Sequence, residues 1–377
     1  MKSLYKYFIL FLIITSCGPK EKASNSLSIY FKLNNEIIKL SDISTVYDII
    51  KLKDDSSNVI GNVDKLICRN GKIYTLDSYG SKSIFVFDET GELILKINNV
   101  GKGPGEYLYP NDFDINDYNG EIHVLDTNHR KLIVYNKKGV YVREIHIKFS
   151  PFSFAVTNDG KYIFSLGNYP NDNLKKIIIT DSNGNIIKYS EKVHINSEFK
   201  NLMLGEQKEI HHINNKIYIT PSQQNKVYIY AQDEVAEKYT LDFGKYNLPK
   251  EIFPDDFSRE DKIKKLMTSN YIYFISNYCE TDNYLLFTSI VNNKLIYFLY
   301  NKHDNVTFCT SKIVDDILNI GFTNCFTTDN NFIYGIFDSY HIELVKPYIK
   351  NAKLKAIIKK MNSFSNPIVI KYKLKNE

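Results

Sequence analysis

The sequence predicts an all-β fold, and three observations support this prediction. The chain of 377 residues contains 29 tyrosines and 23 phenylalanines, and aromatic residues are enriched in strands. Short apolar or alternating runs recur along it, separated by turn residues such as Asn70-Gly71 and Asn119-Gly120, where glycine permits the positive φ of a tight hairpin. These runs also repeat at a nearly constant spacing.

The clearest repeat covers two consecutive units. Their strand-like runs are residues 63–68, 72–77, 83–88 and 91–97, followed by 111–115, 121–126, 131–136 and 139–145. Asp77 and Asp126 lie 49 residues apart at equivalent positions, and Gly91 and Gly139 lie 48 residues apart. Four short strands in each such period are typical of a β-propeller blade.

Four more units follow with weaker markers. They cover residues 152–189, 209–243, 271–310, and finally 322–336 together with 366–374. The sixth unit lacks an outermost strand, and an isolated run over Val46–Leu52 matches the missing one. We therefore predict a six-bladed β-propeller of four-stranded blades whose ring is closed by the N-terminal strand. A β-sandwich is the structural alternative, but it does not predict a repeat of this length.

Two segments break the β pattern and predict short helical insertions. Ser258 and Asp261 form a capping-box pattern ahead of residues 259–267. In the second segment the apolar residues recur at helical spacing, at Leu354, Ile357, Ile358 and Met361. We expect both helices to lie in loops over one face of the ring.

The first residues have the layout of a secretion signal. Lys2 and Lys6 precede an apolar run over residues 7–14, which is shorter than the roughly 20 residues that span a bilayer. The following Ile14-Thr15-Ser16-Cys17 resembles the lipobox of bacterial lipoproteins, which implies cleavage after residue 16 and a lipid on Cys17. An ordinary signal peptide with an incidental cysteine is the alternative.

This N-terminal pattern divides the chain into three parts. Residues 1–16 are predicted to be a lipoprotein signal peptide, residues 17–39 a flexible tether, and residues 40–377 the propeller domain. The expected location is the cell envelope, with the lipid in the outer membrane. The sequence leaves both the periplasmic and the surface face open.

Charge and cysteine content narrow the functional classes. A formal net charge of +5 over this length gives no case for nucleic-acid binding. Four further cysteines lie in apolar runs without C-x-x-C spacing: Cys68, Cys279, Cys309 and Cys325. Buried free thiols are favoured, while a disulfide stays open, with Cys309 and Cys325 as the first pair to test.

A distinctive loop connects the first two units. It is formed by Gly101, Lys102, Gly103, Pro104, Gly105, Glu106 and Tyr107. Together with residues 111–115 and 122–126, it resembles the six-bladed β-propeller lipoproteins common in Bacteroidota, which carry a related Gly-Arg-Gly-Pro-Gly-Glu-Phe loop. Residues 47–52 and 366–372 resemble the first and last strands of that family. The resemblance covers roughly residues 40–374 and implies the fold but no activity, because related propellers include lyases, lactonases and binding modules.

The loop has two interpretations. A dinucleotide-binding pattern needs G-x-G-x-x-G at the start of a helix. This loop contains Pro104 instead, and strand-like runs follow the loop. A tight connection between blades is therefore favoured, with Glu106 accepting hydrogen bonds from the backbone, and ligand contact is the alternative. Lys102 replaces the arginine of the resembling family, which removes a bidentate donor.

No catalytic or metal-binding set is predicted. Asp77 and Asp126 are equivalent in the repeat, but the other four units do not continue the acid, so turn capping is favoured over a metal in the channel. The eight histidines are scattered, and the adjacent His211 and His212 point to opposite faces of a strand. We expect no cofactor, with a divalent cation in the central channel as the alternative.

A lysine-rich segment accompanies the second predicted helix. Its members are Lys346, Lys350, Lys353, Lys355, Lys359 and Lys360. A solvated face is favoured, and a patch facing an acidic glycan, a lipid headgroup or a protein partner is the alternative. Tyrosines at loop ends can stack on sugar rings or peptide side chains: Tyr79, Tyr107, Tyr109, Tyr118 and Tyr169.

These observations favour a membrane-anchored lipoprotein whose propeller serves as a binding scaffold at the cell envelope, without evident catalysis. Its predicted partners are the membrane, through the N-terminal lipid, and a glycan, a peptide or an envelope protein, with no nucleic acid. The alternative is a propeller enzyme of the lactonase or lyase kind with a metal in the central channel.

Overall fold

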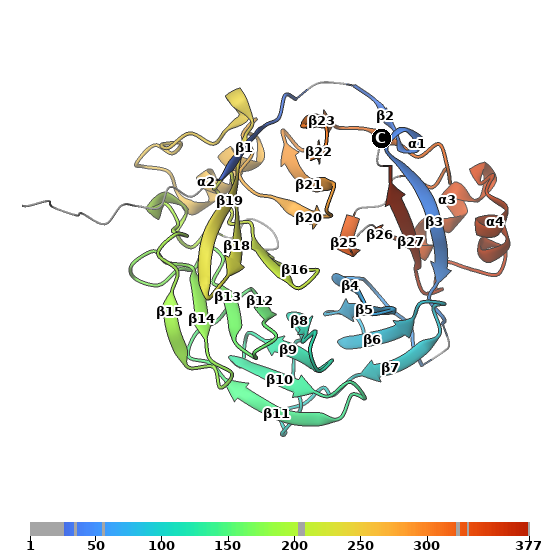
Figure 1. Ribbon diagram of the computed structural model, residues 1–377, viewed down its shortest axis with the longest axis horizontal. Helices are drawn as coiled ribbons and strands as arrows, with labels where there is room; N and C mark the ends of the chain where they lie inside the picture. Colours follow the sequence, from blue (N-terminus) through green and yellow to red (C-terminus); the bar gives the residue numbers. More distant parts are fainter. Residues whose placement is uncertain are drawn as a thin grey trace, which may run out of the picture.

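Six small antiparallel sheets surround a central axis in a computed structural model of the chain (Figure 1). The structure describes residues 26–33, 36–54, 57–202, 208–321, 325–329 and 332–375. The predicted six-bladed β-propeller of four-stranded blades is therefore confirmed. The signal residues 1–16 and Cys17 lie outside the described residues.

Each blade runs from an inner strand beside the axis to an outer strand at the rim. Blade 1 contains β4 (Lys65–Arg69), β5 (Lys72–Asp77), β6 (Ser83–Asp88) and β7 (Leu93–Ile97). Blade 2 contains β8 (Asp112–Ile115), β9 (Ile122–Asp126), β10 (Lys131–Tyr135) and β11 (Tyr141–His146). Blade 3 contains β12 (Ser153–Val156), β13 (Tyr162–Ser165), β14 (Ile177–Thr180) and β15 (Ile186–Tyr189).

The second half of the ring follows the same order. Blade 4 contains β16 (Ile210–Ile213), β17 (Lys216–Ile219), β18 (Lys226–Ala231) and β19 (Glu234–Asp242). Blade 5 contains β20 (Ser276–Glu280), β21 (Tyr284–Val291), β22 (Lys294–Asn301) and β23 (Val306–Thr310). Blade 6 contains β25 (Cys325–Asp329), β26 (Phe332–Phe337), β27 (Ile368–Leu374) and β3 (Ser44–Lys51). The remaining elements are β1 (Leu27–Tyr30), β2 (Ile38–Lys39), β24 (Ile313–Val314), α1 (Leu40–Ile43), α2 (Arg259–Met267), α3 (Ile342–Val345) and α4 (Ala352–Ile358).

The ring is closed as the sequence predicts. Strand β3 from the N-terminal part pairs antiparallel with β27 from the C-terminal part, and the pairs run from Ser44–Leu374 to Lys51–Ile368. The outer hairpin of blade 1 holds the end of β3, because the Lys53 amide donates to the carbonyl oxygen of Gly91 at 2.9 Å. Gly91 has a φ of +88°, and a Cβ there would overlap the carbonyl oxygen of Lys51, so glycine is required at this junction.

The N-terminal strap, which we define as residues 27–33 and 36–43, binds the outside of blades 4 to 6 (Figure 1). Strand β1 adds to β19 in parallel as a fifth strand of blade 4. The alternation of the sequence places Ile29 and Phe31 inward, and both side chains are buried in the core between blades 4 and 5. Leu27–Tyr30 was expected to lie within the flexible tether of residues 17–39. That expectation is wrong for this strand because its apolar face is covered by the propeller.

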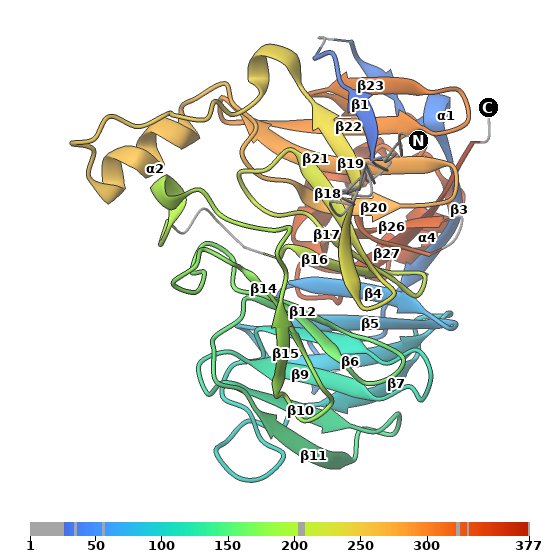
Figure 2. The same cartoon turned by 60° about the vertical axis from the view of Figure 1, so that its left-hand side comes forward.

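The two predicted helices form, but they occupy different places. Helix α2 starts at Ser258, whose hydroxyl accepts from the Asp261 amide while the Asp261 carboxylate accepts from the Ser258 amide, as the capping-box pattern predicts. Figure 2 shows α2 projecting away from the ring. Helix α4 lies at the periphery beside blade 6 (Figure 1), because Leu354 and Ile358 pack against the core of that blade. The expectation that both helices cover one face is therefore wrong for α4.

Three of the cysteines confirm the prediction of buried thiols. Cys68, Cys279 and Cys309 are free and buried. Burial raises the pKa of the Cys309 thiol to about 12 and holds that of Cys68 well above its usual value. The side chain of Cys325 is not among those that the structure describes. Among the residues that the structure describes, no helix has the length and apolar character needed to cross a bilayer.

Candidate functional site

A polar cavity opens where the inner strands end. It has a volume of 610 Å³, and its lining comes from blades 1, 2, 3, 4 and 6. The lining residues are Cys68, Arg69, Asn70, Asp117, Tyr118, Asn158, Asn214, Asn215, Thr328, Asp329 and Phe332. We call this cavity the funnel. Most of these residues belong to the turn between the first and second strands of a blade, and these turns meet around the axis because the blades are repeats.

A second, smaller cavity lies at the other end of the inner strands. It has a volume of 180 Å³ and is lined by residues 64–67, 208, 210–213 and 275–278, together with Asp114 and Thr327. Most of these residues precede or begin an inner strand, whereas the funnel residues end or follow one. We call this space the axial cavity. The two cavities therefore lie at opposite ends of the propeller axis.

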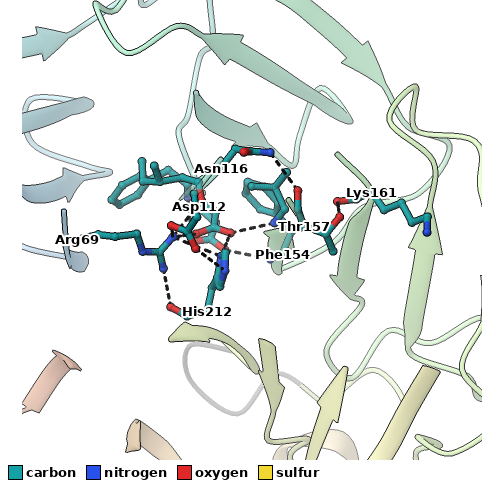
Figure 3. Close-up of polar contacts among 12 residues, drawn as sticks. Arg69, Asp112, Asn116, Phe154, Thr157, Lys161 and His212 are labelled. Carbon is teal, nitrogen blue, oxygen red and sulfur yellow. Dashed lines mark hydrogen bonds and ion pairs between the residues drawn. The ribbon is translucent and has the colours of Figure 1, made fainter. Parts of the chain in front are cut away.

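Four charged side chains separate the two cavities. Arg69 and Asp117 line the funnel, whereas Asp114 and His212 line the axial cavity. Arg69 Nη1 lies 2.9 Å from Asp117 Oδ1, and its Nη2 donates to the carbonyl oxygen of His212 at 2.8 Å. His212 Nδ1 lies 2.7 Å from Asp114 Oδ2, and its Nε2 lies 3.2 Å from Asp117 Oδ2. We call these four residues the axial cluster, and Figure 3 shows Arg69 and His212 converging within it.

The contacts of His212 determine its protonation. Both ring nitrogens face a carboxylate oxygen, so both must carry a proton, which is the imidazolium form. Burial alone lowers the pKa of His212, but the Asp114 carboxylate outweighs burial and holds it above its usual value. Burial would likewise raise the pKa of Asp114, but His212 and Arg69 hold it well below its usual range. The axial cluster therefore pairs two cations with two carboxylates.

The axial cluster is joined to neighbouring blades by backbone contacts. Asp114 Oδ2 accepts from the Val156 amide at 2.9 Å, which connects blade 2 to blade 3. Two positions earlier, Asp112 accepts from the Phe154 amide at 3.1 Å (Figure 3). It also accepts from Lys65 Nζ of blade 1 at 2.7 Å. Because four blades share these contacts, the floor of the funnel is held in a fixed arrangement.

The loop of residues 101–107 lies elsewhere. Glu106 accepts from the Gly103 amide at 2.7 Å, as expected for a tight connection. The fully buried Tyr107 donates to the carbonyl oxygens of Lys82 and Ile97 at 2.9 and 3.0 Å. A Cβ on Gly105, which has a φ of +75°, would come within 2.7 Å of the Tyr141 ring on the outer strand β11. The loop is built into the connection between blades 1 and 2, on the side of the outer strands.

The two repeated aspartates cap turns, as the sequence predicts. Asp77 accepts from the amides of Gly80 and Ser81 at 2.8 and 2.9 Å. Asp126 accepts from the amides of Leu108 and His129 at 2.8 and 3.2 Å. Both carboxylates are fully buried, so these backbone donors satisfy groups that would otherwise be costly to bury.

Two further histidines occupy enclosed positions. His123 Nδ1 lies 3.1 Å from the Tyr162 hydroxyl, and His211 Nε2 lies 2.8 Å from the Thr220 hydroxyl. Burial lowers the pKa of both rings to about 3, so both are neutral. His211 and His212 have different partners, as expected for neighbours on a strand. Within the described ranges, no group of three or more histidine, cysteine, aspartate and glutamate side chains is placed to hold a metal ion.

The sequence analysis missed the axial cluster. Its members are separated by up to 143 residues, and none belongs to a known motif. The available signal was positional, because Arg69, Asp114 and His212 each stand in the inner run of a repeat unit that is otherwise largely apolar. The inner strands of all blades border the same axis, so charged residues on different inner strands can meet despite their separation in the sequence.

Comparisons with solved structures agree with this architecture. A crystal structure of a "putative exported protein" from Bacteroides fragilis aligns with a TM-score of 0.79 and 22% identity, covering 92% of this chain and 99% of that one. A member of the DUF4221 family from Bacteroides vulgatus aligns with a TM-score of 0.53 and 12% identity, covering 89% and 98%. A streptogramin B lyase reaches a TM-score of only 0.43 at 14% identity, covering 78% and 80%. Likeness at these levels extends at most to the fold.

Sequence comparison gives a family but no activity. No curated protein matches the chain. The family model described as "Domain of unknown function (DUF4934)" matches residues 28–373, which includes nearly all of the described propeller. The chain therefore belongs to the DUF4934 family.

Proposed function

We propose that the protein is an envelope lipoprotein whose propeller binds a polar ligand in the funnel, as a binding scaffold without catalysis. The observation that carries this proposal is the convergence of polar side chains from five blades on one cavity. Its volume of 610 Å³ is within the range of about 300–1,000 Å³ that small-molecule sites occupy. The axial cluster beneath it supplies a floor of fixed charges.

The lining indicates the chemistry of the ligand. Four carboxamides face the funnel, from Asn70, Asn158, Asn214 and Asn215. Each carboxamide both donates and accepts hydrogen bonds, which suits hydroxyl and amide groups. Tyr118 at the rim is 85% exposed and offers a flat apolar face with a polar tip. A short glycan or a peptide fits this set, because either combines hydrogen-bonding groups with surfaces that stack on tyrosine.

The envelope location is supported by the N-terminal pattern. The run that ends at Cys17 resembles a lipobox, and the Bacteroides fragilis neighbour is described as exported. The described chain begins beside the rim of blade 4, where β1 pairs with β19. We propose the outer membrane as the site of attachment.

Replacement of Cys17 by alanine is expected to abolish lipid attachment and to release the protein from the membrane fraction, because only a thiol at the cleavage site can be acylated. The measurement is metabolic labelling of cells with a radioactive fatty acid, followed by immunoprecipitation. Cys68→Ala is the matched control, since the Cys68 thiol is buried and should not affect labelling. Equal labelling of the wild type and the Cys17→Ala variant would refute the anchor. Protease treatment of intact cells then distinguishes the surface from the periplasm.

Replacement of Tyr118 by alanine is expected to weaken ligand binding about tenfold, because it removes the stacking surface at the rim of the funnel. Asn158→Ala should weaken binding about fivefold through the loss of one hydrogen bond. Glycan and peptide arrays identify the ligand, and calorimetry on that ligand gives the affinities.

Tyr79→Ala is the matched control for these variants. Tyr79 is 76% exposed but is not part of the funnel lining, so the affinity should be unchanged. A ligand that binds equally well to the Tyr118→Ala and Asn158→Ala variants would place the site outside the funnel. A stoichiometric, tightly held divalent ion found by elemental analysis would contradict the scaffold and favour the metal-dependent enzyme.

A further inference from the structure

The insertion in blade 6 exposes large apolar side chains. It comprises residues 338–367, between β26 and β27, and includes α3 and α4. Its most exposed apolar residues, with their exposed fractions, are Tyr340 (77%), Leu344 (69%), Tyr348 (68%) and Phe364 (82%). Single exposed apolar residues are common on protein surfaces, but four such residues in one short insertion are typical of an interaction surface.

Three of these side chains form a stripe. Two 3-10 turns, Ser339–His341 and Lys346–Tyr348, flank α3 and make successive helical turns. Tyr340, Leu344 and Tyr348 recur every fourth residue, so they follow one side of these turns. Ile342 and Ile349 are buried in the core of blade 6 on the other side. The segment is therefore apolar toward the propeller and also apolar toward solvent.

Phe364 extends the stripe at one end. Tyr340 and Phe364 line the same surface cavity of 350 Å³ at the base of the insertion. We call Tyr340, Leu344, Tyr348 and Phe364 the outer stripe.

The insertion also contains most of the excess positive charge of the chain. Its six lysines are Lys346, Lys350, Lys353, Lys355, Lys359 and Lys360, and all are exposed. Its only acids are Asp338 and Glu343, so its formal net charge is +4, against +5 for the whole chain. Lys353 pairs with Asp48 of β3, and Lys346 lies 3.5 Å from Glu343. The remaining lysines lie in α4 or within two residues of its ends.

We propose that the blade 6 insertion lies on the surface of an anionic lipid bilayer. Exposed tyrosine and phenylalanine together with lysine are typical of segments that rest in the membrane interface. The lysines contact anionic headgroups, and the outer stripe enters the boundary between headgroups and acyl chains. An acidic glycan would account for the lysines and could stack on the tyrosines, but it offers no apolar phase for the exposed Leu344 side chain.

Chain length is consistent with this contact. Cys17 precedes Ser26, the first described residue, by nine positions, and nine extended residues span at most about 30 Å. The inference rests on the proposed envelope location, but it requires neither the acyl group nor the funnel ligand. A basic patch and an acyl chain together hold a protein at a membrane more firmly than one signal alone.

The contact would also orient the ring. Helices α3 and α4 lie at the periphery in Figure 1, beside the outer strand of blade 6 rather than over the axis. A bilayer against the outer stripe therefore meets the rim of the propeller, and the funnel remains open to the surrounding medium.

Single-tryptophan variants test this proposal directly, because the chain contains no tryptophan. Tyr348→Trp and Phe364→Trp place a fluorescent reporter in the outer stripe, and Tyr79→Trp is the control on blade 1. The protein is the mature chain, residues 18–377, without an acyl group, which retains every described residue. Vesicles of phosphatidylglycerol with phosphatidylcholine should shift the emission of the two outer-stripe reporters to shorter wavelength, and the Tyr79→Trp reporter should not respond.

Charge variants provide the second measurement. Four lysines of the insertion are changed together to glutamine: Lys350, Lys355, Lys359 and Lys360. Vesicle binding should weaken by roughly 600-fold, because each of the four lysines near an anionic surface contributes about a fivefold factor. A matched variant changes four lysines in and around the α2 insertion to glutamine: Lys245, Lys250, Lys264 and Lys265. It alters the net charge equally and should bind nearly as well as the wild type.

Several outcomes would overturn the proposal. These are no binding to anionic vesicles at low salt, equal binding to pure phosphatidylcholine vesicles, or equal losses in the two lysine variants. Preference for soluble heparin over vesicles would assign the lysines to an acidic glycan instead. Thermal unfolding of each variant establishes that the ring is intact. Because the test uses neither the acyl group nor the funnel, its failure is distinct from failure of the lipid anchor or of the ligand site.

Discussion

Replacement of Asp114 by asparagine is expected to lower the free energy of unfolding by about 3–5 kcal/mol. Asp114 is fully buried and faces both the His212 imidazolium and the backbone of blade 3. An asparagine keeps the shape but removes the charge, so Arg69 and His212 would share only Asp117 and leave a net positive charge buried. Breaking one side of a buried ion pair is costly because the remaining charge is out of water and uncompensated.

Urea denaturation of the two proteins measures this loss. Asp48→Asn is the matched control, because Asp48 pairs with the exposed Lys353 and should contribute less than about 1 kcal/mol. Nitrogen NMR of His212 gives a second measurement: both ring nitrogens should be protonated at neutral pH in the wild type, and the pKa should fall in the Asp114→Asn variant. A loss no larger than that of the control would show that the axial cluster does not bear on stability.

Acidification from pH 6.5 to pH 4 is expected to lower the free energy of unfolding by on the order of 6 kcal/mol, about 3 kcal/mol for each of two buried neutral histidines. Burial lowers the pKa of His123 and His211 to about 3 in the folded chain, against about 6.5 in an unfolded one. Below pH 6.5 the unfolded chain therefore binds protons that the folded chain does not. The stability contributed by these two neutral rings is present above pH 6.5 and is lost as the pH falls.

His212 has the opposite effect on the pH dependence of the free energy of unfolding. The pKa of His212 is raised in the folded protein, so its contribution is fully present below pH 6.5 and is lost as the pH rises through the folded pKa. The contribution of His212 is therefore nearly constant between pH 6.5 and pH 4, and the net change in that interval is the loss caused by His123 and His211. Urea titrations at several pH values measure the slope, and His123→Asn should reduce it. Stability that stays level or increases between pH 6.5 and pH 4 would contradict the assignment of neutral rings.

The repeat made the fold predictable. Equivalent residues such as Asp77 and Asp126 recur at the blade period, and this period alone indicates four strands in each unit and six units in the ring. Closure was also predictable, because Val46–Leu52 supplied the strand that the last unit lacked and β3 confirms it. These features depend on local residue patterns and on the number of repeat units, and both can be read directly from a sequence.

The candidate site depended on distant residues, and sequence reasoning did not find it. Arg69, Asp114 and His212 meet because successive inner strands turn around one axis, and no local spacing records that meeting. The most distinctive local pattern is instead the loop of residues 101–107, where Gly105 permits close packing against Tyr141 and Glu106 completes a turn. Strand β1 was missed for a similar reason, since its partner β19 lies about 200 residues later in the sequence.

The N-terminal strap has a consequence for the order in which the protein matures. Ribosomes and secretion channels deliver a polypeptide from its first residue onward, yet β1 pairs with a strand of blade 4 and β3 with the last strand of blade 6. Strand β1 therefore stays unpaired until blade 4 has been made, and β3 stays unpaired until nearly the whole chain has been made. Contacts across such long separations form slowly. Truncation within the C-terminal strand β27 should leave β3 without its partner, so that proteases can cleave the N-terminal part of the chain.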